Sequence, residues 1–491
     1  MISKDFKFIK PGEVRTRIAP SPTGQLHIGT ARTALFNYLF AKKHEGSFIL
    51  RIEDTDKERS TPEFEKDIIN GLKWLGLIWD EGPETEGKYG PYRQSQRIDI
   101  YKKYLEELLS QNKAYYCFCS EQDLEAERQY QMSQGLAPKY SGKCSNLDES
   151  TVKKYLAEGK PSTIRFRTVP KKVVFEDLIR GKLEFDSSLI GDTVIAKSLK
   201  EPLYNFAVVV DDFEMKISHI IRGEDHISNT PKQILLQEAL GLPHPFYGHL
   251  PLILDEDRSK MSKREGATSV FEFRKEGYLS EALINFIAFL GWNPGDEREI
   301  YSLASLVKEF SMEKIQKGGA IFNIKKLDFL NGFYIRQRSQ EKLAELCLPY
   351  LAAAGINDID SEKLIEIVSI YQERLKKLSE IVELTDFFFK EKLAYEKSML
   401  RWREMTDKET KDSLDKLEKL LSKIKEQEWQ KQNLENILLQ EAEKTNNRGA
   451  LLWPLRVALT AKQASAGPFE IAEILGKEKT LERIKEAKEL F

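Results

Sequence analysis

Residues 14–30, which read VRTRIAPSPTGQLHIGT, decide the fold. Apolar residues alternate with two arginines over 14–18, and this period of two predicts a short strand. Prolines and a glycine break the chain at 20–24, and from Ile28 apolar residues recur at helical spacing. A second strand is expected at 47–52, before an acidic run. Strand, loop, helix and strand in this order open an α/β nucleotide-binding fold.

Composition excludes several classes of protein. The 491 residues carry 76 Lys+Arg against 78 Asp+Glu, and a net charge of −2 excludes a strongly basic nucleic-acid coat. Hydrophobic residues make up 41% of the chain, which is enough for several cores. No apolar run approaches the ~18 residues of a membrane span, and the N-terminus lacks the apolar core of a signal peptide. With four cysteines, we expect a cytoplasmic protein without a disulfide framework or membrane contact.

Changes of pattern divide the chain into segments. Residues 110–195 hold three of the four cysteines and short strand signals around glycine and proline, which indicates an insertion into the α/β domain. The α/β pattern resumes over 196–265, where 205–210 is predicted to be a strand. After about residue 325, apolar residues recur every three to four positions beside Lys and Glu, which predicts a bundle of amphipathic helices.

Two loops are candidate phosphate-binding sites. In the first, the glycine-bearing loop before the predicted helix lets backbone N–H groups approach a polyphosphate, with His27 at the helix mouth. In the second, KMSKR at 260–264, two lysines three residues apart can clamp a triphosphate and neutralise a departing pyrophosphate. Taken alone, the first also fits a helix-capping histidine and the second a solvated basic turn. Both together, separated by an interrupted α/β pattern, favour ATP-dependent chemistry.

These motifs carry a resemblance to a known family. HIGT at 27–30 and KMSKR at 260–264 resemble the HIGH and KMSKS signature motifs of class I aminoacyl-tRNA synthetases. The motifs that resemble the glutamate and glutamine branch are RIAPSPTG at 17–24, RIEDTD at 51–56, YNF at 204–206, VDD at 210–212 and IRGED at 221–225. The resemblance extends from about residue 13 to WPLRVALT at 453–460. The chain is thereby similar to the bacterial-type glutamyl-tRNA synthetases.

The resemblance implies a fold and a reaction. The fold is a Rossmann-like catalytic domain with an inserted α+β domain, followed by an all-α anticodon-binding region. The implied boundaries are 13–109 and 196–265 for the catalytic halves, 110–195 for the acceptor-binding insertion, 266–330 for a connecting domain that contacts the tRNA stem, and 331–491 for the helical region. The reaction joins glutamate to the 3′ end of tRNA-Glu through a glutamyl-adenylate, using ATP with Mg²⁺. In this family, activation typically waits for bound tRNA.

The resemblance also implies roles for single residues. His27, Lys260 and Lys263 are the implied catalytic residues. The ATP-binding set is Pro20, Thr23, Gly24, His27, Gly29, Thr30, Lys260, Met261, Ser262, Lys263 and Arg264. The glutamate-binding set is Arg17, Ala19, Ser21, Glu53, Tyr204 and Arg222.

Physical chemistry agrees with this pocket. Guanidinium groups bind carboxylates through two parallel hydrogen bonds, so Arg17 is expected to take the substrate side chain and to reject neutral glutamine. Glu53 is expected to hold the substrate ammonium, and Arg222 to lie near either carboxylate or the adenylate. Each of these charges could instead form a strand-end ion pair. Val208 stands where some relatives have a pocket asparagine.

The cysteines form an incomplete zinc pattern. Many relatives bind structural zinc through Cys-x-Cys and a later Cys-x-His or Cys-x-Cys, and here Cys117, Cys119 and Cys144 match three positions. Asn146 occupies the usual fourth position, and Tyr140 is the substitute ligand by resemblance to a shortened relative. A site that keeps its shape without metal is the competing interpretation.

Other functions remain open at this level. The enzyme could also charge tRNA-Gln, or be a glutaminyl-tRNA synthetase, although a helical C-terminal region argues against the second. A small nucleotidyltransferase would not need the long helical half of the chain. A helical scaffold with an inactive α/β domain would not need the intact motifs. We expect a monomer, with Arg374 and the Asn446-Asn447-Arg448 loop as candidates for reading the anticodon.

Overall fold

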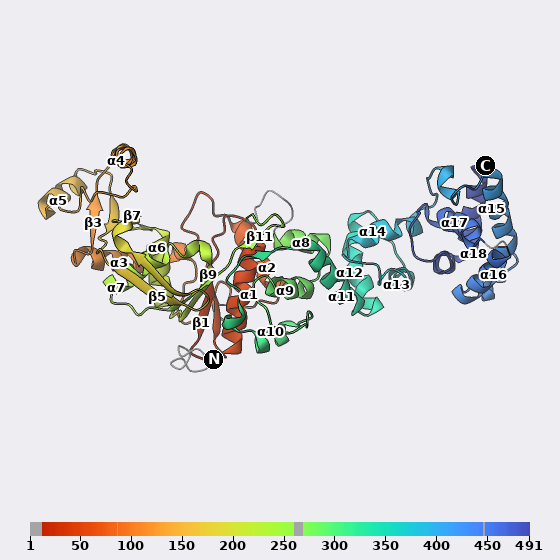
Figure 1. Ribbon diagram of the computed structural model, residues 1–491, viewed down its shortest axis with the longest axis horizontal. Coiled ribbons are helices and arrows are strands. Elements are labelled where there is room, and N and C mark those ends of the chain that lie inside the picture. Colours follow the sequence, from red (N-terminus) through yellow and green to blue (C-terminus); the bar gives the residue numbers. More distant parts are fainter. Residues whose placement is uncertain (1–11, 86, 260–268, 445–446) are drawn as a thin grey trace. The chain divides into compact units, whose positions relative to one another are not determined.

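The computed structural model of the protein describes residues 12–85, 87–259, 269–444 and 447–491 (Figure 1). These residues form two compact units. The first unit holds the described residues up to Arg274 together with Ser280–Leu327, and the second holds Lys275–Leu279 and Asp328–Phe491. No helix in the described part of the chain is both long and apolar enough to cross a membrane.

A parallel sheet forms the centre of the first unit. Its first strands are β1 (Arg15–Ile18), β2 (Ser47–Leu50), β9 (His219–Gly223) and β10 (Phe246–Leu250). β1 pairs with β2 and β9 with β10, and the backbone N–H of Ser218 donates to the Arg15 carbonyl at 3.0 Å, so β9 begins beside β1. The predicted opening of strand, loop, helix and strand is present, and α1 (Ile28–Lys43) is its helix.

Two strands that the sequence assigns to the insertion belong to the catalytic sheet. β5 (Lys172–Asp177) and β6 (Gly181–Asp186) continue the sheet of β9 and β10 in the order β6-β5-β10-β9. Asp177 at the end of β5 lies opposite Tyr247 of β10. The expected boundary at residue 195 therefore differs from the sheet pairing, because local pattern does not indicate which distant strand an edge will meet.

The remaining insertion is an antiparallel sheet with two helices. The strands are β3 (Ala114–Cys117), β4 (Thr163–Phe166), β7 (Val194–Ser198) and β8 (Glu201–Pro202), in the order β3-β4-β7-β8. The helices are α4 (Glu121–Ser133) and α5 (Glu149–Ala157). Around the catalytic sheet lie α2 (Pro62–Trp74), α3 (Ile98–Ser110), α6 (Tyr204–Glu214), α7 (Thr230–Ala239), α8 (Val270–Glu276), α9 (Ser280–Ala288), α10 (Leu303–Glu309), β11 (Ile253–Leu254) and β12 (Ala320–Ile321).

The predicted strand at 205–210 is wrong, because these residues lie in the helix α6. The β-branched run Val208–Val210 favours a strand locally. In the fold, Phe206, Val208 and Val210 are each 1% exposed or less. Burial of the apolar face of a helix outweighs the small difference in intrinsic propensity.

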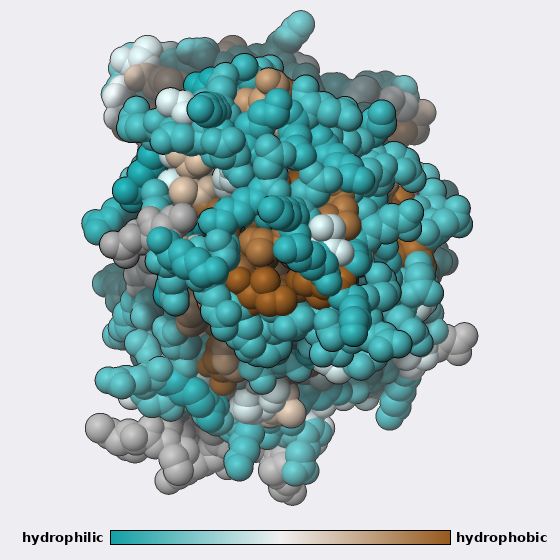
Figure 2. Space-filling model, turned by 90° about the vertical axis from the view of Figure 1, so that its right-hand side faces the viewer, coloured by the Kyte–Doolittle hydropathy of each residue, from teal (hydrophilic) through white to brown (hydrophobic). Residues whose placement is uncertain are grey.

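The second unit contains helices and no strand among its described residues. Its helices, of which α11 begins in the first unit, are α11 (Ile324–Arg336), α12 (Gln340–Ala353), α13 (Ser361–Ser369), α14 (Glu380–Thr385), α15 (Asp407–Leu421), α16 (Lys431–Glu443), α17 (Arg448–Thr460) and α18 (Pro468–Glu489). In α15 the leucines at 414, 417 and 421 recur every three to four positions and are buried, and Thr406 and Glu409 cap its start reciprocally. Figure 2 shows a mainly hydrophilic face with its most prominent hydrophobic patch near the centre and smaller ones elsewhere.

Candidate active site

A cavity of about 640 Å³ in the first unit collects the residues that the sequence singles out. It lies where β1, β2 and β9 end and α1 begins, because parallel strands present their carboxyl ends at one edge of a sheet. The predicted residues on its wall are Arg17, Ala19, Pro20, Ser21, Thr23, Gly24, His27, Gly29, Thr30, Glu53, Tyr204 and Arg222. Lys260, Met261, Ser262, Lys263 and Arg264 lie outside the described residues.

The start of α1 forms one end of this cavity. His27 is the N-cap residue, and its Nδ1 accepts the backbone N–H of Gly29 at 3.1 Å. A neutral His27 ring therefore carries its proton on Nε2, where it is a hydrogen-bond donor. The first turn of α1 contains no acidic residue, so the positive end of the helix dipole is not neutralised there. This end of the cavity suits a phosphate group.

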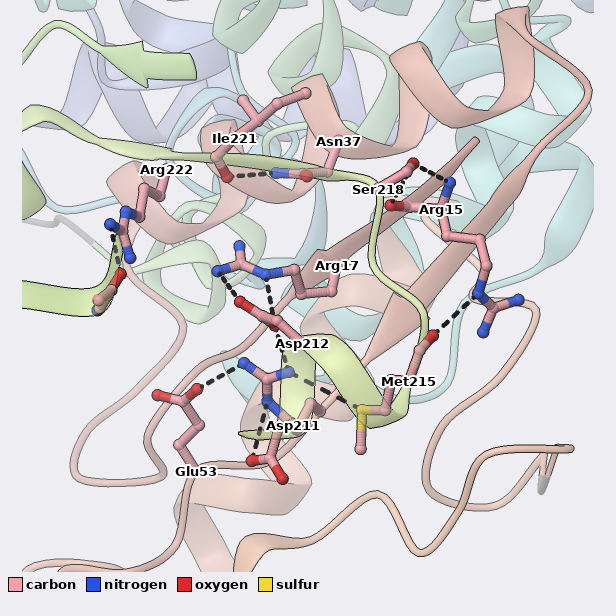
Figure 3. Close-up of polar contacts among 12 residues, drawn as sticks. Arg15, Arg17, Asn37, Glu53, Asp211, Asp212, Met215, Ser218, Ile221 and Arg222 are labelled. Atoms are coloured by element: carbon pink, nitrogen blue, oxygen red, sulfur yellow. Dashed lines mark hydrogen bonds and ion pairs between the residues drawn. The ribbon is translucent and has the colours of Figure 1, made fainter. Parts of the chain in front are cut away.

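A chain of buried charges forms the other end (Figure 3). Asp212 accepts from Arg17 Nε at 3.1 Å and Nη2 at 3.3 Å, and from Arg51 Nη1 at 2.6 Å. Arg51 also donates through Nη2 to Glu53 at 3.0 Å. Arg51 thus joins the partner of Arg17 to Glu53 and fixes the two predicted substrate contacts relative to each other.

The electrostatics of this chain are set by burial and by its arginines. Burial raises the pKa of the Asp212 carboxyl, but Arg17 and Arg51 outweigh it and hold that pKa below its ordinary value. For Glu53 burial dominates, and its pKa is raised although Arg51 opposes the shift. An ammonium group beside Glu53 would favour its charged form.

The buried cluster carries one more positive than negative group. Its guanidinium groups belong to Arg17, Arg32, Arg51, Arg97 and Arg222, and its carboxylates to Glu53, Asp177, Asp211 and Asp212, all at most 6% exposed. Arg97 donates to Asp211 at 2.6 Å. A ligand that brings a net negative charge compensates this excess, whereas a neutral ligand leaves it buried.

Arg222 has one side-chain nitrogen without a hydrogen-bond partner in the described part of the chain. Its Nη2 donates to Thr230 Oγ1 and to Gln233 Oε1, both at 2.8 Å, and its Nε to His249 Nε2 at 3.3 Å. Nη1 is buried and has no hydrogen-bond partner among the described residues, while Arg222 lines the cavity. A buried donor without a partner is costly, so this nitrogen suits a carboxylate of a bound ligand.

The sequence did not predict several of the residues that support the site. Arg51 and Asp212 stand inside quoted motifs, and their charge next to predicted strands and turns could have indicated them. Thr230, Gln233 and His249 carry no such signal. They are found only because α7 and β10 pack beside the end of β9.

The three cysteines of the insertion converge as a donor set. Cys117, Cys119 and Cys144 place their sulfur atoms within 4.8 Å of one another, with Cys119 and Cys144 Sγ 3.6 Å apart. Tyr140 Oη lies 3.4 Å from Cys117 Sγ and 3.6 Å from Cys119 Sγ. Two thiolates bound to one tetrahedral zinc lie about 3.8 Å apart, so this arrangement fits zinc with Tyr140 as fourth donor. Cys347 is fully buried in α12 and takes no part.

Comparison with known proteins identifies the class. Residues 13–329 match the family described as class I tRNA synthetases (E and Q), catalytic domain, and residues 342–488 match an anticodon binding domain. The chain belongs to the class I tRNA synthetases of the glutamate and glutamine group. It is an ATP-using enzyme, and its predicted fold class, a Rossmann-like catalytic domain with a helical anticodon-binding region, is confirmed.

Individual relatives are similar over nearly the whole chain. A glutamate–tRNA ligase of Caldicellulosiruptor saccharolyticus is 49% identical and covers 96% of this chain and 98% of its own length. That of Bacillus subtilis is 43% identical, covering 96% and 99%. A crystal structure of a glutamate tRNA ligase from Elizabethkingia meningosepticum in complex with its amino acid is 35% identical, with a TM-score of 0.87 over 97% of this chain and 99% of that one.

Proposed function

We propose that this enzyme is a glutamate–tRNA ligase, which joins glutamate to the 3′ end of tRNA-Glu at the expense of ATP. The observation that carries the proposal is the excess positive charge of the buried cluster beside Arg17 and Arg222. Glutamate at neutral pH brings two carboxylates and one ammonium, so it compensates that charge, whereas glutamine does not. The similar proteins named glutamate–tRNA ligases support the same substrate.

Glutamate activation needs no covalent nucleophile of the protein. The substrate α-carboxylate attacks the α-phosphorus of ATP, and the enzyme supplies positioning and charge stabilisation. Arg17 and Glu53 are proposed to hold the side chain and the ammonium of glutamate, because Arg51 and Asp212 fix them across the pocket. Ala19, Ser21 and Tyr204 complete the wall, and Arg222, which also lines the cavity, is proposed to bind a substrate carboxylate.

The phosphate end is assigned to α1 and to the second loop. His27 Nε2–H is aimed at the triphosphate, which the helix N-terminus also attracts. Lys260 and Lys263 are proposed to neutralise the departing pyrophosphate, with Mg²⁺ bound by phosphate oxygens. Lys263→Ala is expected to lower the adenylation rate and barely change tRNA affinity, and an unchanged rate contradicts that role.

A charging assay with separated tRNAs tests the function. The purified full chain is given ATP, Mg²⁺ and radiolabelled glutamate or glutamine, with either tRNA-Glu or tRNA-Gln. We expect glutamyl-tRNA-Glu and no glutaminyl product, and little ATP–pyrophosphate exchange until tRNA is added. Charging of tRNA-Gln with glutamate as well makes the enzyme non-discriminating, and transfer of glutamine contradicts the proposal. The reaction places the enzyme in the cytoplasm, beside its tRNA.

The cysteine cluster is proposed to hold a structural zinc ion. Burial raises the pKa of Cys119 to about 11, and a bound Zn²⁺ would reverse this by stabilising the thiolate. Metal analysis of the purified chain is expected to give one zinc per molecule, and Cys119→Ser to lose it. Cys347→Ser is the matched control, since Cys347 lies in the other unit. Wild-type protein without zinc supports the metal-free interpretation.

The helical unit is proposed to bind the anticodon. Burial lowers the pKa of Arg456, and the positive charge of exposed Arg374 adds to the shift, so these two arginines form a local positive region. Of the second candidate, Asn447 caps α17 and Arg448 pairs with Glu443 at 2.7 Å, while Asn446 is outside the described residues. Arg374→Ala is expected to raise KM for tRNA without changing KM for ATP.

A further inference from the structure

His249 is held between a carboxylate and the guanidinium of Arg222. Its Nδ1 lies 2.6 Å from Asp177 Oδ2, and its Nε2 lies 3.3 Å from Arg222 Nε. The side chains of Asp177 and His249 are completely buried. Asp177 is the last residue of β5, so it reaches the catalytic centre from a segment that the sequence assigns to the insertion.

The partners of His249 leave it one possible tautomer. A carboxylate can only accept a hydrogen bond and a guanidinium can only donate one. The ring must therefore be neutral, with its proton on Nδ1 and its lone pair on Nε2. Burial lowers the pKa of His249, and although Asp177 opposes this, the net shift also favours the neutral ring.

Asp177 is itself fixed by the backbone. Its Oδ1 accepts the N–H groups of Ile179 at 2.9 Å and Arg180 at 2.8 Å. Because these backbone N–H groups can only donate, the atom at this position must be a hydrogen-bond acceptor, and in an asparagine variant it would be the amide oxygen. The direction of each hydrogen bond in the series from Asp177 through His249 to Arg222 is therefore determined by the backbone N–H groups that hold Asp177.

We propose that Asp177 and His249 are positioning residues for glutamate recognition. Asp177 fixes the tautomer of His249, and His249 fixes the angle at which the Arg222 guanidinium is held at the cavity wall. This inference rests on the proposed function. It differs from the role of Asp212, which holds Arg17 by direct ion pairing. Neither Asp177 nor His249 lines the cavity, so they act on the substrate only through Arg222.

The arrangement is not a nucleophilic triad. Thr230 Oγ1 lies 3.1 Å from His249 Nε2, which on distance alone resembles a hydroxyl–imidazole–carboxylate set. Thr230 is completely buried, accepts Arg222 Nη2 and does not line the cavity. No substrate carbonyl can reach this hydroxyl, so positioning is the role that remains.

Asp177→Asn is the variant that tests the proposal. The Asn oxygen stays on the backbone N–H groups, so its amide donates to His249 Nδ1 and moves the ring proton to Nε2, against the Arg222 donor. We expect KM for glutamate to rise about 10–100-fold, as expected when a buried hydrogen bond to a charged group is lost, with KM for ATP within about twofold of wild type. A glutamate KM within about twofold of wild type overturns the proposal.

Two matched controls separate positioning from general loss of packing. His219→Phe changes another buried histidine, on the same strand as Arg222 but in contact with Ser218, Phe40 and Phe246. Asp192→Asn changes a carboxylate of the insertion that accepts from Tyr115 and Thr168. Both are expected to leave KM for glutamate within about twofold of wild type.

Nitrogen-15 NMR of histidine-labelled protein reads the tautomer directly. The chain has only six histidines, and the His249 signals are assigned by their loss in His249→Phe, which retains a ring beside Tyr247. We expect the Nδ1–H tautomer in wild type and the Nε2–H tautomer in Asp177→Asn. The wild-type spectrum needs a folded wild-type chain only, so it tests the proposal even where Asp177→Asn does not fold. Failure of wild type to charge tRNA with glutamate overturns the proposed function, whereas an Nε2–H tautomer in active wild type overturns the positioning role alone.

Discussion

Two buried arginines, one in each unit, differ in the groups to which they donate hydrogen bonds. Arg222 of the first unit is 4% exposed and Arg483 of the second is 1% exposed. Arg483 donates to the backbone carbonyls of Leu459 at 2.6 Å, Phe387 at 2.6 Å and Lys390 at 3.1 Å. Among the described residues Arg222 donates to side chains only. It lines the cavity, and its buried Nη1 has no partner in that part of the chain.

The comparison teaches that burial of a charge does not by itself indicate a ligand. Both arginines have a buried nitrogen without a partner in the described chain, Nε in Arg483 and Nη1 in Arg222. The carbonyls on Arg483 end helices or turns and need donors for the fold itself. The second unit has a cavity of its own, also of about 640 Å³, and Arg483 does not line it. What separates the two roles is that Arg222 lines a cavity, whereas Arg483 does not.

The largest effect is expected from Arg17→Leu. This change removes the guanidinium from a buried pair and leaves Asp212 to Arg51 alone, so kcat/KM for glutamate should fall more than a hundredfold, about 3–5 kcal/mol. The control is Arg15→Leu on the same strand, because Arg15 pairs with Glu81 away from the cavity. A loss below tenfold for Arg17→Leu, or equal losses for both variants, breaks the proposed distinction.

Arg483→Met tests the structural side of the comparison. Removing three donors from buried carbonyls should cost about 3 kcal/mol of unfolding free energy in the second unit. Urea unfolding followed by the fluorescence of Trp402, Trp429 and Trp453 measures this change. KM for glutamate should stay at the wild-type value, and a selective rise in that KM would assign Arg483 to the substrate.

His27 combines a structural role, capping α1, with a proposed role as hydrogen-bond donor to phosphate, and two variants separate them. His27→Asn retains a side chain that caps α1 but loses the imidazole donor, so adenylation should slow about a hundredfold at unchanged Tm. His27→Ala should lose the cap as well and cost about 1 kcal/mol of stability. If Asn restores full activity, His27 is a helix cap and no more.

The smallest effect concerns pH and the buried His219. Burial lowers its pKa to about 3 in the fold, against about 6.5 in an unfolded chain. Between these values the unfolded chain binds a proton that the folded chain does not, so stability falls as pH falls below 6.5, by about 1.4 kcal/mol per pH unit. Tm measured at pH 6.5 and 5.5 should drop less in His219→Phe than in wild type. Equal drops would show that His219 does not titrate in this way.

Local pattern sufficed for the features that short stretches determine. The opening strand, loop and helix and the amphipathic helices after residue 325 follow from spacing and residue type within a few positions. Arg17 and Glu53 came from the resemblance to the synthetase family, and both lie on the cavity wall with His27. Pattern failed at α6, where three valines favour a strand and burial on a helix face prevails. The roles of the matched residues stay predictions until the assays above are done.

Only the tertiary structure decided which distant groups meet. Arg17 and Asp212 are 195 residues apart, and Asp177 and His249 are 72 apart, yet each pair is in hydrogen-bond contact. Sequence alone determined that charged side chains stand at the ends of strands. The pairing of β5 with β10 in the order β6-β5-β10-β9 brought Asp177 to His249, and the packing of α6 brought Asp212 to Arg17. Such pairing is non-local, and the charge of a side chain does not indicate its partner. The orientation of a guanidinium group depends on those partners. They therefore also decide whether an arginine such as Arg222 or Arg483 binds a ligand or stabilises the fold.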